Sequence, residues 1–249
     1  MQFELLPCIE KMIEFYGQPK SAARFKTYLN MMLDKKGEEV VLPIMIFNPM
    51  AKPHVVEKLK ELSQLDAEQI ANVRLEDINQ RLQQFHQLKD KEIFKVCLVV
   101  ADDLKGGWTN RFTTDYQCRF TIKGLLNRNF CTPIFWSSET YDKELINTRI
   151  NEFVWRTVFQ KIYLQPESLE EHIKQEAFVC ENCHNVPPKF KEIDHVLAVF
   201  RQHQHTYDRN ILISFLYGDA AAIELGYTPL GLPAFAGINA ASQIIEKYY

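Results

Sequence analysis

The sequence predicts an α+β fold with one mixed or antiparallel sheet of about four strands, flanked by N-terminal and C-terminal helices. Three observations predict it. Short apolar runs gather in the middle of the chain, the segments on either side show helical spacing of apolar residues, and no internal repeat or linker-like tract is present. At 249 residues the chain suits a single domain. We expect a sheet-containing part at about residues 40–136 and a helical part at about residues 139–249.

The N-terminal helices are predicted from their ends. The stretch "LPCIEKMIEFYG" ends at Gly17, and a second helix begins at Ser21 and ends before Gly37. A serine at the start caps free amide groups, and a glycine after basic residues is a typical helix end. A third helix is predicted after Asp66, where apolar residues recur at positions 75, 78, 82 and 85.

The strands are predicted from apolar runs and from one alternating pattern. Residues 40–47 and 93–101 are continuous apolar runs that suit buried strands, and residues 131–136 form a short third one. In "RFTTDYQCRFTIK", residues 111–123, apolar and polar side chains alternate almost strictly. That period of two predicts a half-exposed antiparallel strand.

Helices are predicted again beyond the sheet. Residues 142–164 carry apolar side chains along one face, and residues 166–180 begin with a proline followed by glutamates, as helix starts often do. Further helices are predicted at residues 189–202 and 208–225, and a short one ends the chain.

Composition narrows the classes of function. The formal net charge is -3 and no block of lysine or arginine stands out, so we expect no nucleic-acid partner. No apolar run has the length of a membrane-spanning helix, and the first residues do not resemble a secretory leader. The six cysteines are scattered, several of them in apolar runs, as in proteins with reduced thiols. We therefore expect a soluble, cytoplasmic protein without membrane association.

The stretch "AFVCENCHNVPP" contains the pattern C-x-x-C-H at Cys180, Cys183 and His184. The pattern is used for covalent haem, for thiol redox chemistry and for zinc. Haem c is disfavoured because its attachment requires export and a second axial ligand, and the last methionine is Met50, far upstream. Thiol redox chemistry is disfavoured because the thiols would lie at a helix C-terminus, where the helix dipole opposes thiolate formation.

Two interpretations of the motif remain. In the first, zinc is bound by a set of four residues: Cys180, Cys183, His184 and His195. A variant of this site would use a stripe along one continuous helix, formed by His172, Glu176, Cys180 and His184. In the second interpretation, which we favour, the cysteines pack at the end of a helix, because cysteine is among the most buried residue types.

A second candidate site follows the apolar run at residues 93–101. Asp102 and Asp103 come directly after it, on a stretch with two adjacent glycines, and are followed by Trp108, Asn110 and Arg111. Polar groups at the end of a buried strand, on a glycine-containing loop, are typical of ligand sites. An aspartate would be the acid or base, Trp108 would stack on a flat ligand, and Arg111 would hold an anionic group. A Gly-Gly turn that closes a β-hairpin is the alternative explanation.

The sequence thus supports two hypotheses of different classes. In the first, the protein binds or acts on a small polar ligand through residues 102–111. In the second, it is a non-catalytic interaction protein with a structural zinc site at Cys180, Cys183, His184 and His195.

Overall fold

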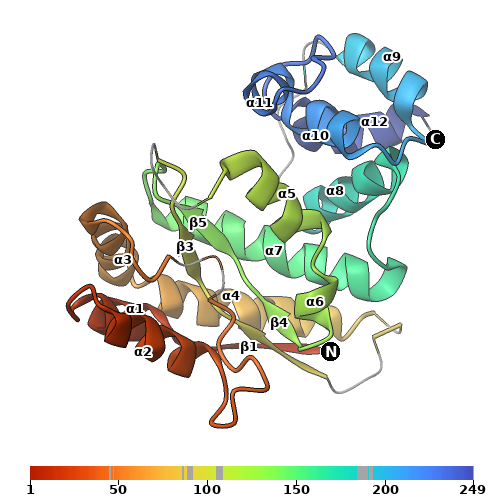
Figure 1. The fold of residues 1–249 in the computed structure, drawn as a ribbon. Helices are drawn as coiled ribbons and strands as arrows, with labels where there is room; N and C mark the ends of the chain where they lie inside the picture. The colour runs from red at the N-terminus through yellow and green to blue at the C-terminus, as the bar shows by residue number, and fades with distance from the viewer. Residues whose placement is uncertain are drawn as a thin grey trace. The chain divides into compact units, whose positions relative to one another are not determined.

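The structure is a computed structural model that describes residues 1–44, 46, 48–85, 87–88, 92–104, 109–183, 190 and 193–248. The chain forms two compact units, whose elements are drawn in Figure 1. Unit 1 comprises Met1–Arg111 and Lys123–Val154, and unit 2 comprises Phe112–Ile122 and Trp155–Tyr249.

The strands of unit 1 all pair in parallel. β1 (Gln2–Leu5), β2 (Ile93–Val96) and β4 (Phe130–Cys131) form a three-stranded sheet in that order. β3 (Val99–Ala101) pairs with β5 (Ile134–Trp136) in a second, two-stranded sheet. Between the two, the Cys97 amide donates to the Cys131 carbonyl and the Val99 amide to the Pro133 carbonyl, both at 3.0 Å. β3 and β5 therefore continue the direction of β2 and β4.

The predicted sheet is correct in its central strands and wrong in its type. The expected antiparallel or mixed arrangement of about four strands is replaced by parallel pairs. Residues 93–101 and 131–136 do form strands, and their continuous apolar runs are typical of parallel strands covered on both faces. In the described part of residues 40–47 no strand forms. Val40 makes an isolated antiparallel bridge to Leu33, while Leu42 and Ile44 are buried.

Unit 1 also contains several helices. They are α1 (Ile9–Tyr16), α2 (Ala22–Met32), α3 (Pro53–Gln64), α4 (Ala67–Leu82), α6 (Lys123–Leu126) and the first part of α7 (Lys143–Tyr163). α4 packs on β1 and α3 packs on β3. The predicted cap at Ser21 is confirmed, because its side chain accepts a hydrogen bond from the Arg24 amide. Asp66 occupies the N-cap position of α4 as predicted, but its side chain makes no capping hydrogen bond.

Among the described residues of unit 2, the regular elements are all helices. Its elements are α5 (Arg111–Phe120, of which Arg111 belongs to unit 1), the second part of α7, α8 (Leu169–Cys183), α9 (Ile193–His203), α10 (Arg209–Tyr217), α11 (Asp219–Leu225) and α12 (Ala236–Tyr248). α12 packs against α8, α9 and α10. The core of the unit is apolar and rich in aromatic rings, among them Phe120, Phe200, Phe215 and Tyr217.

The strand predicted at residues 111–123 is wrong, because residues 111–120 form helix α5. Phe112, Tyr116 and Phe120 are spaced by four, so the alternating pattern also places them on one helical face. Asp115 and Arg119, also four apart, form a buried ion pair along the helix. A helix brings side chains four residues apart into contact, whereas in a strand they would lie about 13 Å apart and the ion pair could not form.

Among the described helices, none is long and apolar enough to cross a membrane.

Candidate functional site

Two polar segments meet at the carboxyl ends of β3 and β5. Ala101 pairs with Trp136, so the residues that follow on each strand continue side by side. The Ser137 hydroxyl donates to Asp102 Oδ1 at 2.7 Å, and the Ser138 hydroxyl donates to Asp103 Oδ2 at 2.7 Å. The carboxyl ends of parallel strands are where ligands bind in many α/β proteins. This edge is therefore the candidate site.

Helix α3, which lies beside β3 in Figure 1, adds a histidine to this edge. Pro53 occupies the first position of α3, where its missing amide hydrogen costs nothing, and His54 follows in the first turn. His54 Nε2 lies 2.8 Å from Asp102 Oδ1. The Asp102 side chain is 3% exposed and the His54 side chain 33%. The histidine is thus the solvent-facing member of the pair.

The environment of Asp102 keeps its carboxyl group ionised at neutral pH. Burial by itself raises the pKa of Asp102, but hydrogen bonds from His54, Ser137 and the Leu104 amide outweigh burial, and the pKa lies below its ordinary value. An ionised carboxylate only accepts hydrogen bonds, so the proton in the contact belongs to His54 Nε2. His54 Nδ1 is left as the ring nitrogen that can accept a proton or a hydrogen bond from a ligand.

Asp103 holds the loop that follows β3. Its carboxylate accepts from the Ser138 amide at 3.0 Å and pairs with Arg111 at 3.0 Å. Arg111 also pairs with Glu139 at 3.0 Å, and Glu139 pairs with Arg149 at 2.9 Å. This alternating set of charges, which we call the loop clasp (Asp103, Arg111, Glu139 and Arg149), is compensated within itself. It ties the end of the loop to the end of β5.

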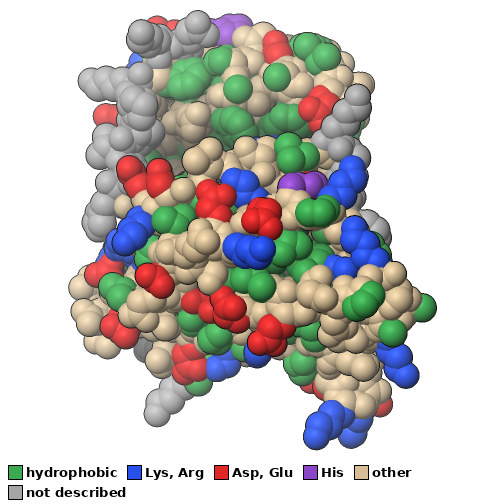
Figure 2. Space-filling view, turned by 90° about the vertical axis from the view of Figure 1, so that its left-hand side faces the viewer, with side chains coloured by type: hydrophobic (Ala, Val, Ile, Leu, Met, Phe, Trp, Pro, Cys, Tyr) green, Lys and Arg blue, Asp and Glu red, His purple; other side chains and the backbone are tan. Residues whose placement is uncertain are grey.

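The surface charge is mixed on the face that Figure 2 draws. Figure 2 shows acidic and basic side chains interspersed over one face of the molecule, with neither sign predominating. Because the charges of the loop clasp are paired with one another, a ligand at this edge would be recognised by hydrogen bonds more than by net charge.

The structure brings together three of the residues predicted at this site. Asp102, Asp103 and Arg111 meet at the strand ends, but both aspartates are turned inward and only 3% of each side chain is exposed. Asn110 lies on the same loop and is exposed. Trp108 lies outside the described residues. The β-hairpin alternative is wrong, since the chain continues from β3 into α5 and β3 pairs in parallel with β5.

Sequence reasoning missed His54, Ser137 and Ser138. The two serines follow "IFW" in the same way that the aspartates follow "VVA", so the signal of polar residues after a buried strand was present in both places. His54 carried a weaker signal, a polar ring next to a proline at a helix start.

The arrangement is suited to proton transfer and not to nucleophilic attack by serine. His54 and Ser137 both contact Asp102 Oδ1. A nucleophilic serine needs the histidine as its own base, whereas here the two side chains share a carboxylate. An aspartate that orients a histidine and stabilises its charged form is a common design for a general acid or base.

The predicted metal ligands are dispersed or lie outside the described residues. Cys180 and Cys183 lie in the last turn of α8, as expected for a helix end, and His184 is not among the described residues. His195 Nε2 lies 3.1 Å from the Gly231 carbonyl. Within the described ranges, no group of three or more histidine, cysteine, aspartate or glutamate side chains is placed to hold a metal.

Two members of the alternative set of metal ligands along α8 make other contacts. His172 is completely buried and its Nε2 lies 3.0 Å from the Tyr116 hydroxyl. Glu176 pairs with Arg156 at 2.6 Å. Both side chains therefore belong to the interior of unit 2.

No protein-family model, curated protein or solved structure matches this chain. The geometry at the strand ends is therefore the basis for the function proposed below.

Proposed function

We propose that unit 1 binds a small, uncharged polar ligand at the carboxyl ends of β3 and β5, and that His54 exchanges a proton with it. The contact between His54 and Asp102 carries the proposal. It joins a buried carboxylate of lowered pKa to a partly exposed imidazole at 2.8 Å. A buried partner that holds one tautomer of an accessible histidine is what acid–base chemistry requires.

In the proposal, neighbouring residues hold His54 and Asp102 in position. Ser137 donates to the carboxylate that His54 contacts, so Asp102 keeps two donors. The Thr109 hydroxyl donates to the Asp102 carbonyl at 2.9 Å, so Thr109 lies close to the residue that follows β3. Because Arg111 is already paired with two carboxylates, we expect the ligand to carry hydroxyl or carbonyl groups and no strong negative charge.

The tautomer of His54 tests the arrangement directly. Long-range proton–nitrogen NMR distinguishes imidazoles protonated at Nε2 from those protonated at Nδ1, and His54→Gln identifies the signals. We expect the Nε2-protonated form in the wild type. Asp102→Asn should abolish that preference, because an amide can donate as well as accept. A mixed population in the wild type that Asp102→Asn leaves unchanged would contradict the proposal.

Ligand binding is tested with named probes in the same spectra. Glycerol, ribose and glucose are titrated as uncharged hydroxyl compounds, with acetate and inorganic phosphate as anions. We expect at least one hydroxyl compound to shift the His54 signals while those of His205 stay in place. His205 is a matched control because its side chain is 77% exposed and lies in unit 2. Equal shifts at both histidines, or none at His54, would refute the binding site.

A further inference from the structure

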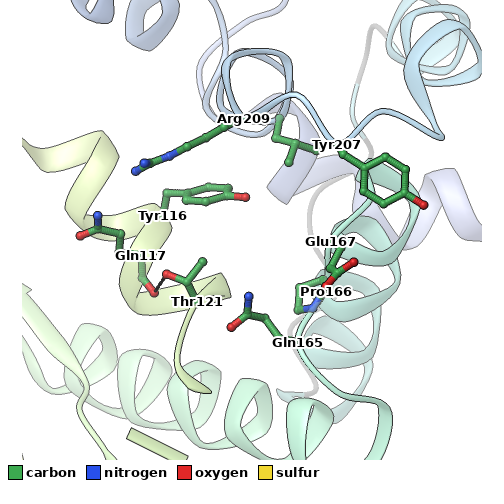
Figure 3. A pocket seen from close by; sticks show the side chains of 9 residues that line it. Tyr116, Gln117, Thr121, Gln165, Pro166, Glu167, Tyr207 and Arg209 are labelled. Atoms are coloured by element: carbon green, nitrogen blue, oxygen red, sulfur yellow. Dashed lines mark hydrogen bonds between the residues drawn. The ribbon is translucent and has the colours of Figure 1, made fainter. Parts of the chain in front are cut away.

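Unit 2 contains a pocket of about 260 Å³ that shares no lining residue with the strand-end site of unit 1. Its polar side chains come from α5 and the residue after it, from the segment before α8 and from the start of α10. They are Tyr116, Gln117, Thr121, Gln165, Glu167 and Arg209. Figure 3 shows these side chains arranged around one space, with the Tyr116 hydroxyl pointing into it.

Two opposite charges line this pocket without meeting. Arg209 lies over the ring of Tyr116, with its guanidinium carbon 5.6 Å from the ring centroid. Glu167 lies at the other end of the group in Figure 3. Within the described part of the chain, neither side chain forms an ion pair with the other or with a third residue. One pocket thus offers a separate site for each sign of charge.

The buried histidine behind the pocket determines what Tyr116 offers to a ligand. His172 Nδ1 lies 2.7 Å from the Ser168 carbonyl, which only accepts, so this nitrogen carries the proton. Burial lowers the pKa of His172 to about 4, so the ring is neutral and Nε2 has no proton. The Tyr116 hydroxyl therefore donates to Nε2 and presents its oxygen lone pairs to the pocket.

Thr121 is constrained in the same way. Its hydroxyl donates to the Gln117 carbonyl at 2.9 Å, the contact drawn as a dashed line in Figure 3. The Thr121 oxygen is then an acceptor toward the pocket. Tyr116, Thr121 and Glu167 thus supply acceptors for a group with several N–H donors, such as an ammonium group. Arg209 supplies donors for a carboxylate, which a guanidinium binds well.

We propose that this pocket binds a small zwitterion whose charged groups are separated by several atoms, such as an ω-amino acid, with its carboxylate at Arg209 and its ammonium group at Glu167, where Tyr116 and Thr121 are further acceptors. The volume supports a ligand of this size, since pockets for larger ligands begin at about 300 Å³. Pro166, Tyr207 and Leu212 complete the lining and give apolar surface for part of the ligand. This site is independent of the ligand proposed for unit 1.

Calorimetric titration of the full chain with linear ω-amino acids, from β-alanine to 6-aminohexanoate, tests the proposal, and glycine serves as the probe whose charges lie too close together. We expect at least one ω-amino acid to bind, and its N-acetyl and carboxamide derivatives, which lack the positive and the negative charge respectively, to bind at least about tenfold more weakly. If no ω-amino acid binds at 10 mM, or if both derivatives bind as well as the parent, the assignment is wrong.

Two substitutions locate the binding. Arg209→Gln and Glu167→Gln each remove one charge from an exposed side chain, so both variants should fold like the wild type. We expect each to weaken the amino acid about tenfold, while the carboxamide loses its dependence on Arg209 and the N-acetyl form its dependence on Glu167.

Further variants control for the loss of a charge as such and for binding at the strand-end site of unit 1. Arg201→Gln and Glu181→Gln remove the same charges from exposed positions on α9 and α8. They should leave affinity unchanged, as should His54→Gln in unit 1. Amino-acid binding that survives both pocket substitutions, or that falls equally in the controls, would overturn the proposal.

Discussion

Arg156 of α7 and Glu176 of α8 form a two-point ion pair inside unit 2. The guanidinium Nε lies 2.8 Å from one carboxylate oxygen and a terminal nitrogen lies 2.6 Å from the other. Each side chain is 2% exposed. Gln175 extends the contact, since its amide donates to the same carboxylate at 3.2 Å and accepts from Gln160 at 2.8 Å. Buried charges of this kind are tolerated because each has a partner.

Removing one member of the pair should be costly. We expect Glu176→Gln to lower the free energy of unfolding by about 3–5 kcal/mol, because the buried Arg156 charge then lacks its counterion. Urea denaturation measures the change. The double variant Arg156→Met/Glu176→Leu should recover most of the loss, since it removes both charges. A loss below about 1 kcal/mol in Glu176→Gln would show that the pair is not desolvated as described.

His172 should make unit 2 sensitive to mild acid. Its pKa is about 4 in the folded protein, against 6.5 for an ordinary histidine, because burial outweighs the charges of Glu176 and Glu171. Between those values the unfolded chain binds a proton that the folded chain does not, so stability falls as the pH drops. At about 1.4 kcal/mol per pH unit, we expect a loss of about 2 kcal/mol between pH 7 and pH 5 from this residue.

Urea denaturation at both pH values separates this effect from that of the carboxylates. His172→Gln has no titrating ring, so its stability should change less between pH 7 and pH 5 than that of the wild type, by about 2 kcal/mol. His203→Gln, a change at the end of α9, is the matched control and should keep the wild-type dependence. An unchanged pH dependence in His172→Gln would mean that the ring is charged or hydrated in the folded state.

The sequence was a good guide to where elements lie and a poorer one to their type. The central strands and most helices fall where spacing and caps predict them. The segment at residues 111–120 was misjudged because Phe112, Tyr116 and Phe120 fit both a period of two and a spacing of four. Only the tertiary partners of Tyr116 and Phe120 in the core of unit 2 decide between the two. β1 was missed because four residues hold too little pattern.

At the candidate site, the sequence located the edge but not the residue open to a ligand. Asp102 and Asp103 were predicted from the strand that precedes them, which depends on local order alone. Their inward orientation depends on Ser137 and Ser138, which are more than thirty residues away. The accessible His54 reaches the edge from α3, across 48 residues of sequence. Contacts at such separations follow from the fold and not from a motif.

Replacing Asp103 should lower the free energy of unfolding more than replacing His54. Asp103 has a 3% exposed side chain that binds Arg111 and the Ser138 amide, so Asp103→Asn should lower the free energy of unfolding by about 1–3 kcal/mol. His54 is partly exposed, and His54→Gln should stay within about 1 kcal/mol of the wild type. Thermal and urea denaturation measure both. The reverse order would assign the structural role to His54 and contradict its role at the site.

The turn between α10 and α11 requires a glycine at position 218. Gly218 has φ of 83°, where side chains are strained, and a Cβ there would lie 2.1 Å from the Pro233 carbonyl oxygen. The backbone of Pro233, and not a flexible side chain, occupies that space. The backbone cannot move away without disturbing the nearby hydrogen bond from the Phe235 amide to the Tyr217 carbonyl. We expect Gly218→Ala to lower the free energy of unfolding by about 3 kcal/mol or more, from strain and overpacking together.

Gly226 separates the two causes of that loss. It also has a positive φ, 71°, but a Cβ there would meet nothing within 4 Å. Gly226→Ala should therefore show the backbone cost alone, about 1 kcal/mol. Urea denaturation of the two variants side by side measures the difference, which reports the close approach of Pro233. If both substitutions cost the same, the chain near Pro233 does not lie against Gly218 in solution, and the packing at this turn is looser than described.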